Sequence, residues 1–224
     1  MDEYLSEKEQ WDRIKTYLRE EGPWIIAIVA VGALAYSGWR WWQGRQEQQA
    51  LDAEARYEQI LVAFDHGDRA RALTLVEELR REHSGSPYLD QADLAAARFF
   101  VETGEADKAM ERLRVVMQGT ADPELATISR LRLARVQISA GKPDDALATL
   151  GTQDRGAFAS RYHEVRGDAY FAKGDKAGAL REYRAAQHSA ASAADASDEL
   201  TLKINDLAGE AGAAQPPAAA TAAR

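Results

Sequence analysis

Four glycines divide the longer, C-terminal part of this chain into units of similar length. Gly67, Gly104, Gly141 and Gly174 are separated by 37, 37 and 33 residues. Five residues after each glycine stands an alanine: Ala72, Ala109, Ala146 and Ala179. A large apolar residue follows each alanine, and another packing residue comes three positions later: Leu73 and Val76, Met110 and Leu113, Leu147 and Leu150, Leu180 and Tyr183. A repeat this regular restricts the chain to a stack of similar structural units.

Each unit has the features of two helices joined by a tight turn. The glycine can adopt the positive φ that such a turn requires, and the small alanine lets the two helices approach closely. A further small residue precedes the glycine by seven positions in three units (Ala97, Ala134 and Gly167), whereas the first unit has Ile60 there. These offsets are typical of the tetratricopeptide repeat, although two spacings exceed its usual length of about 34 residues. We therefore expect an all-α protein built on a tetratricopeptide-type α-solenoid of about four helix pairs.

The repeat and the helix-terminating residues also predict where the helices lie. We expect helices at 48–65, 69–83, 87–103, 105–118, 123–140, 143–150, 157–173 and 175–190. A last helix at 195–209 carries Leu200, Ile204 and Leu207 on one face, so it should cap the open end of the solenoid. Residues 210–224 are of low complexity and rich in alanine and proline, and we expect a disordered tail there.

A second feature, the apolar segment Trp24–Trp42, precedes the repeats. No charged residue occurs between Trp24 and Trp39, and a helix of this length extends roughly 28 Å, close to the hydrocarbon thickness of a bilayer. Tryptophans at both ends (Trp24, Trp39, Trp41 and Trp42) are typical of membrane-interface anchors. We expect a single N-terminal transmembrane helix at 23–43, the alternative being a buried helix of a soluble core. A cleaved signal peptide would have a basic start and a small-residue cleavage site, both of which this segment lacks.

The charges that flank this segment predict its orientation. Four lysines and arginines precede it and two or three follow it, a weak bias that favours a cytosolic segment 1–22, with the domain at 44–209 on the opposite side of the membrane. Within segment 1–22, Trp11, Ile14 and Leu18 form a short apolar stripe. Two interpretations of the stripe remain open, an interfacial or partner-binding helix and a loosely ordered tail.

Composition and motifs exclude several classes of function. The net charge is −8, and after the first 46 residues it is −7, which lacks the basic footprint of a nucleic-acid-binding protein. The chain has no cysteine, no phosphate-binding loop and no HExxH motif, and its four histidines lie far apart in the sequence. We therefore expect no enzyme, no catalytic residue, no metal site and no cofactor.

Recognition of other proteins is the function that remains. The first helix of each pair lines the concave side of a tetratricopeptide stack. Counted from the glycines, the residues expected on this side are Tyr57, Leu61, Phe64, Leu94, Arg98, Val101, Leu131, Arg135, Ile138, Arg161, Glu164, Asp168 and Phe171. Arginines among apolar side chains suit an extended peptide. The alternative is that the apolar residues belong to the core and the arginines pair with neighbouring acids.

Four blocks of sequence stand out: GWRWWQ (Gly38–Gln43), LRLARVQ (Leu131–Gln137), RGDAYFAKGDKAGAL (Arg166–Leu180) and KINDL (Lys203–Leu207). Together they resemble the YfgM family of ancillary subunits of the bacterial SecYEG translocon. The resemblance runs to about residue 208 and does not include the tail. It implies a single-pass protein of the bacterial inner membrane with a cytoplasmic N-terminus and a periplasmic helical domain.

The resemblance also implies partners and a task. The implied partners are SecYEG, a PpiD-like membrane-anchored chaperone and translocating polypeptides, which the protein would help hand over to periplasmic chaperones. An alternative function is a regulatory or assembly scaffold for an envelope-stress or cell-envelope pathway, in which the segment 1–22 contacts a cytosolic partner.

Overall fold

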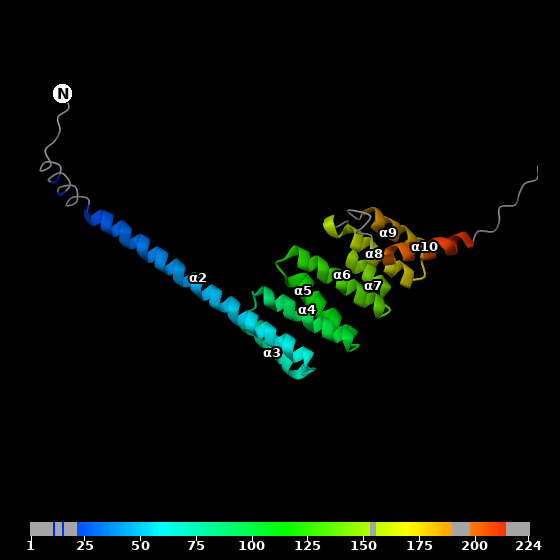
Figure 1. Ribbon diagram of the computed structural model, residues 1–224, viewed down its shortest axis with the longest axis horizontal. Coiled ribbons are helices and arrows are strands. Elements are labelled where there is room, and N and C mark those ends of the chain that lie inside the picture. Colours follow the sequence, from blue (N-terminus) through cyan, green and yellow to red (C-terminus); the bar gives the residue numbers. More distant parts are fainter. Residues whose placement is uncertain (1–10, 12–14, 16–21, 153–155, 190–197, 214–224) are drawn as a thin grey trace, which may run out of the picture. The chain divides into compact units, whose positions relative to one another are not determined.

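The computed structural model describes the backbone of residues 11, 15, 22–152, 156–189 and 198–213, and the side chains of 11, 15, 24, 27–152, 156–189 and 198–209. Most of the segment 1–22 and residues 214–224 of the expected tail therefore lie outside the described residues. Every element in the described part of the chain is helical (Figure 1). The chain divides into two compact units, Met1–Ala55 and Arg56–Arg224.

The helix α2 (Gly22–Asp65) includes the whole apolar segment and the first expected solenoid helix. We expected separate helices at 23–43 and 48–65, and this boundary is wrong: the helix continues without a break. The intervening residues are Gly44 and then arginine, glutamine and glutamate, three types that favour helix, and the single glycine costs only about 1 kcal/mol. The four tryptophans of the segment are exposed, and Arg45 stacks on the Trp41 ring at 4.5 Å. Within the described residues, no helix combines the length and the hydrophobicity that a membrane span requires.

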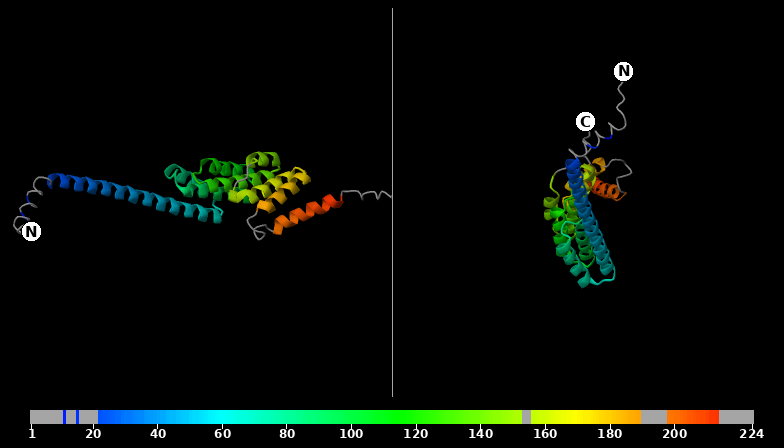
Figure 2. Two further views of the ribbon diagram at one scale, coloured as in Figure 1. Left: turned by 90° about the horizontal axis from the view of Figure 1, so that it is seen from above. Right: turned by 90° about the vertical axis from the view of Figure 1, so that its left-hand side faces the viewer.

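The remaining helices follow the predicted repeat closely. They are α3 (Arg69–Glu82), α4 (Pro87–Glu102), α5 (Ala106–Gly119), α6 (Pro123–Ser139), α7 (Pro143–Leu150), the 3-10 helix η1 (Gly156–Phe158), α8 (Ala159–Ala172), α9 (Lys176–Ser189) and α10 (Asp198–Ala213). Consecutive helices pack on one another from α3 to α10, and α8 also packs on α6. This is the arrangement of a helical-hairpin solenoid, and Figure 2 shows α10 as its last layer against α9. α10 ends four residues beyond the expected boundary at 209.

The four repeat glycines confirm the predicted turns. Their φ angles are +72°, +76°, +73° and +83° at Gly67, Gly104, Gly141 and Gly174, in the left-handed region that disfavours residues with a Cβ. The residue that follows each of these glycines donates its backbone N–H to the carbonyl oxygen of the residue five positions before it. The Glu105 N–H, for example, donates to the Phe100 carbonyl at 2.7 Å. This bond satisfies a carbonyl that the helix end would otherwise leave unpaired.

The small residues of the repeat are where the helices touch. Ala72, Ala109, Ala146 and Ala179 have no exposed surface. In the fourth repeat unit, a Cβ at Gly167 would overlap the ring of Tyr183, because the ring packs directly on the glycine backbone. Only a residue without a side chain fits there. The sequence pattern therefore predicted the closest helix–helix contacts as well as the turns.

An ionic contact that the repeat does not predict joins three helices of the first two units. The Asp93 carboxylate of α4 is 1% exposed. It accepts hydrogen bonds from Arg80 of α3 at 2.7 and 2.8 Å and from Arg112 of α5 at 3.0 Å. Arg112 also reaches the exposed Glu77 at 3.1 Å. A carboxylate buried this deeply is tolerated because both arginines neutralise it and occupy its lone pairs.

Candidate peptide-binding groove

A groove of about 690 Å³ lies on the face formed by the first helices of the first three pairs. All residues that line it belong to the compact unit Arg56–Arg224. They come from the C-terminal end of α2, from α4 and from α6, together with Leu113 of α5. The lining residues are Tyr57, Leu61, Phe64, Asp65, Gln91, Leu94, Ala95, Ala97, Arg98, Phe99, Val101, Glu102, Leu113, Arg132, Arg135 and Val136. We refer to this set as the groove.

One part of the groove is apolar. Tyr57, Leu61 and Phe64 follow one another by four and three residues, which places them on one face of α2. The Phe64 ring contacts the ring of Phe99 with centroids 5.0 Å apart. Val101 lies beside them on α4 and remains 49% exposed. An apolar side chain of a ligand could bury its surface against these residues, away from water, without displacing any side chain of the protein core.

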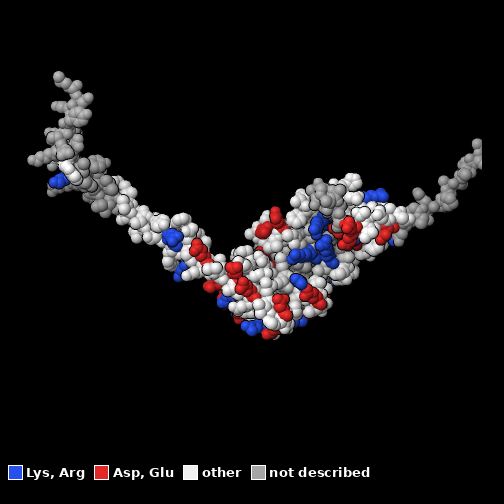
Figure 3. All heavy atoms as spheres, in the orientation of Figure 1, with Lys and Arg blue, Asp and Glu red and all other residues white. Residues whose placement is uncertain are grey.

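The other part of the groove is basic. Arg98 of α4 is paired with Glu102, one helical turn away, at 2.7 Å, and this hydrogen bond raises the pKa of Arg98. Arg132 and Arg135 of α6 are both exposed and form no ion pair with any described residue. Figure 3 shows basic side chains gathered on this face over α6, beside acidic side chains on the α10 side. The groove therefore changes from apolar to cationic between α4 and α6.

The structure brings together a large share of the residues expected on the concave side. Those that line the groove are Tyr57, Leu61, Phe64, Leu94, Arg98, Val101 and Arg135. Leu131 is instead 6% exposed in the core around Tyr162, and Ile138 packs against the same core. For these two residues the alternative interpretation, that apolar residues of the pattern belong to the core, describes the structure. The other part of that alternative, that the arginines pair with neighbouring acids, describes Arg98, which pairs with Glu102.

The fourth pair does not extend the groove, because α10 packs against it. Lys203 of α10 donates to Asp168 at 2.9 Å and lies 3.6 Å from Glu164, while the Tyr183 hydroxyl donates to Asp168 at 2.8 Å. Burial works against the charge of Lys203, but its bonds to Asp168 and Glu199 outweigh burial and raise its pKa. The acids expected to face a ligand are thus occupied by the chain's own lysine.

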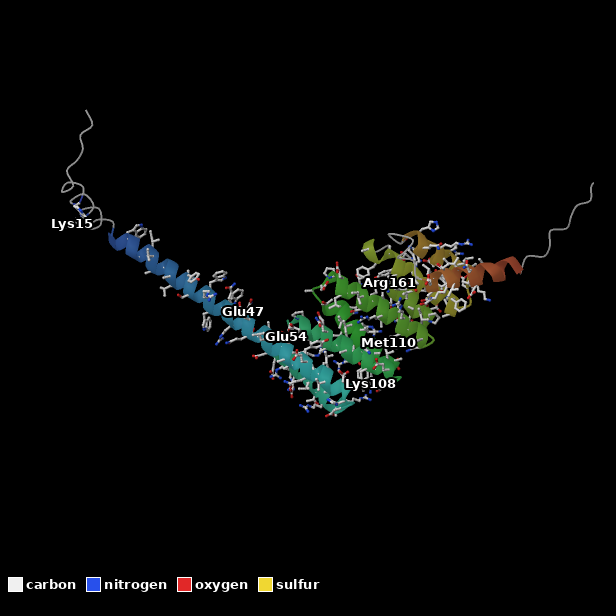
Figure 4. All side chains as sticks on the ribbon, in the orientation of Figure 1. Lys15, Glu47, Glu54, Lys108, Met110 and Arg161 are labelled. Carbon is white, nitrogen blue, oxygen red and sulfur yellow. The ribbon has the colours of Figure 1, made fainter. Side chains whose placement is uncertain are left out.

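The other two residues expected from the fourth pair also lie outside the groove. Arg161 lies exposed on α8 (Figure 4), and Phe171 is 53% exposed near the end of that helix. Neither lines the groove. The glycine register gave their positions along the helix correctly, but it carries no information on where α10 packs.

Arg132 is the basic groove residue that the sequence argument missed. It lies one turn before Arg135, and the counting from Gly141 selected its neighbour Leu131 instead. The sequence did contain a signal for this. Leu131 stands between Arg130 and Arg132, and a leucine is more easily buried than an arginine, so Arg132 was the better candidate for an exposed position. Asp65, Gln91 and Glu102 also line the groove and were not among the positions counted from the glycines. No cluster of three or more potential metal-ligating side chains occurs in the part of the chain that the structure describes.

Comparison with known proteins agrees with this architecture. A family model described as a tetratricopeptide repeat-like domain matches residues 15–209. A curated relative from Escherichia coli, named ancillary SecYEG translocon subunit, is 32% identical over 92% of this chain and 99% of its own length. Relatives of the same name from Haemophilus influenzae and Neisseria gonorrhoeae are 28% and 26% identical, each over 91% of this chain and 98% of their own length.

Among solved structures, the crystal structure of the P58(IPK) TPR domain is similar over 73% of this chain and 48% of that chain, with 17% identity and a TM-score of 0.44. The family model extends from residue 15 to residue 209, and the match to the E. coli relative includes 92% of the chain. The chain therefore belongs to the tetratricopeptide repeat-like family of ancillary SecYEG translocon subunits.

Proposed function

We propose that this protein is a non-enzymatic, membrane-anchored scaffold that works beside the SecYEG translocon. The names of its relatives associate them with that translocon, and the alignment extends over 99% of the E. coli protein. The observation that carries the proposal is the groove: it combines partly exposed apolar side chains with exposed arginines on one helical face, as a site for a polypeptide segment requires.

The remaining parts of the proposal concern location and partners. The apolar segment Trp24–Trp42 anchors the chain in the inner membrane, with its N-terminus in the cytoplasm and the repeat domain in the periplasm. There the groove binds translocating polypeptides or a PpiD-like membrane-anchored chaperone, and the protein assists the transfer of a polypeptide from the channel to periplasmic chaperones. Support for the anchor comes from the sequence, in the uncharged stretch and its terminal tryptophans.

Site-specific crosslinking in intact membranes tests the partners. A photo-crosslinking benzoylphenylalanine at Leu94, inside the groove, should capture a translocon subunit, a PpiD-like chaperone or an arrested translocating chain. The same probe at Val115 of α5 is a matched control, because Val115 is 41% exposed but does not line the groove. Recovery of none of these partners, or equal recovery from both positions, would contradict the proposal.

Topology mapping tests the location. A reporter that is active only in the periplasm should be active when it is fused after residue 209. Extraction of membranes with carbonate should leave the full chain in the pellet. A cytoplasmic reporter signal, or release of the chain by carbonate, would refute the anchor and the orientation while leaving the groove itself unaffected.

A further inference from the structure

The charges around the groove are distributed unevenly, and this unevenness points to the chemistry of the ligand. At the α2–α4 end, Arg98 lies among acids: it is bonded to Glu102, and Asp65 lies close enough to raise the pKa of Arg98 further. At the α6 end, Arg132 and Arg135 have no carboxylate partner among the described residues. The charge of the arginines is thus already compensated at one end of the groove and available to a ligand at the other.

We propose that the groove binds an extended protein segment in which an apolar side chain is followed by a pair of carboxylates. The apolar side chain contacts the surface made by Tyr57, Phe64 and Val101, and the carboxylates bind Arg132 and Arg135. This inference rests on the proposed function and specifies the class of segment that the same groove accepts. Guanidinium groups favour carboxylates because two parallel N–H donors match the two oxygens.

The spacing of the two arginines determines the spacing of the two acids. Arg132 and Arg135 are three residues apart on α6, so their Cβ atoms are separated by about 5–6 Å. In an extended strand, residues i and i+2 point to the same side and lie about 6.5 Å apart. An acid–any residue–acid pattern therefore presents one carboxylate to each arginine, whereas two adjacent acids would point to opposite sides.

Fluorescence anisotropy with three labelled peptides on the full-length protein in nanodiscs tests the inference. The peptides share the apolar start Phe-Leu-Val and a Gly-Ser-Gly spacer, and they end in Glu-Gly-Glu, Gln-Gly-Gln or Lys-Gly-Lys. The Glu peptide should bind about tenfold more tightly than the Gln peptide, since two partly exposed ion pairs contribute modestly. Added salt should reduce this difference.

Charge reversal assigns the effect to the two arginines. The double variant Arg132→Glu and Arg135→Glu should lose the preference for the Glu peptide and bind the Lys peptide instead. The matched control, Arg114→Glu with Arg181→Glu, makes the same charge change at two exposed positions outside the groove and should behave as the native chain. All four arginines are on the surface, so a circular dichroism spectrum should show that both variants fold.

Three results would overturn the inference in distinguishable ways. Equal binding of the Glu and Gln peptides, both abolished by Val101→Glu, would leave a peptide groove without a carboxylate preference, and the proposed function would stand. Failure of every peptide, together with no crosslink from Leu94, would refute both. Binding of phosphatidylglycerol vesicles that depends on Arg132 and Arg135, with no binding of peptides, would show that the arginines serve a lipid surface.

Discussion

The substitution Asp93→Asn isolates the buried ionic contact between α3, α4 and α5. It preserves the shape of the side chain but removes the negative charge, so Arg80 and Arg112 lose their buried counter-ion and keep only the exposed Glu77. Breaking one partner out of a buried pair costs roughly 3–5 kcal/mol. The arginine side chains are 31% and 21% exposed and can recover part of their hydration, so we expect the lower end, about 3 kcal/mol.

Thermal unfolding followed by circular dichroism measures this cost. For a domain of this size, about 3 kcal/mol corresponds to a decrease in Tm of roughly 6–12 °C. The matched control is Glu77→Gln, which removes the exposed acid of the same network; exposed pairs contribute about 0–1 kcal/mol, so the Tm should change by less than about 4 °C. Equal shifts for the two variants, or a shift below about 2 °C for Asp93→Asn, would refute the reasoning that burial makes this pair important.

Three further predictions test the repeat, the ion pairs and the cap. Ala109→Trp should overpack the fully buried contact of the second unit and lower the unfolding free energy by about 1–3 kcal/mol or more; a native-like thermal melt would show that the register is wrong. Hydrogen bonds from Arg69 lower the pKa of Glu105 from 4.5 to about 2, so this pair should stabilise the fold above about pH 4.5 and lose that contribution as the pH falls toward 2. When thermal unfolding is measured at a series of pH values, Glu105→Gln should remove this part of the acid sensitivity, and an unchanged pH profile would contradict the assignment. Leu200→Ala should cost about 2–5 kcal/mol in the docking of α10, seen as faster hydrogen exchange of α10 with no change in α4; uniform acceleration would mean that α10 does not open separately.

The repeat residues determined the helices, the turns and the closest contacts from sequence alone. A glycine at positive φ and an alanine at a helix crossing are local requirements, and each is visible at its own position in the sequence. The break expected after residue 43 was wrong because apolar composition changes there while helix propensity does not. The family blocks, such as RGDAYFAKGDKAGAL, also indicated the family that the comparisons show.

Only the tertiary structure decided which polar groups are paired and where the groove ends. Whether Asp93 is buried depends on Arg80 and Arg112, which lie 13 and 19 residues away on other helices. The acids of the fourth pair could face a ligand or a lysine with the same local sequence; the packing of α10 places Lys203 on Asp168. Local pattern determines local geometry, whereas pairing and accessibility depend on which distant helix arrives at the same surface.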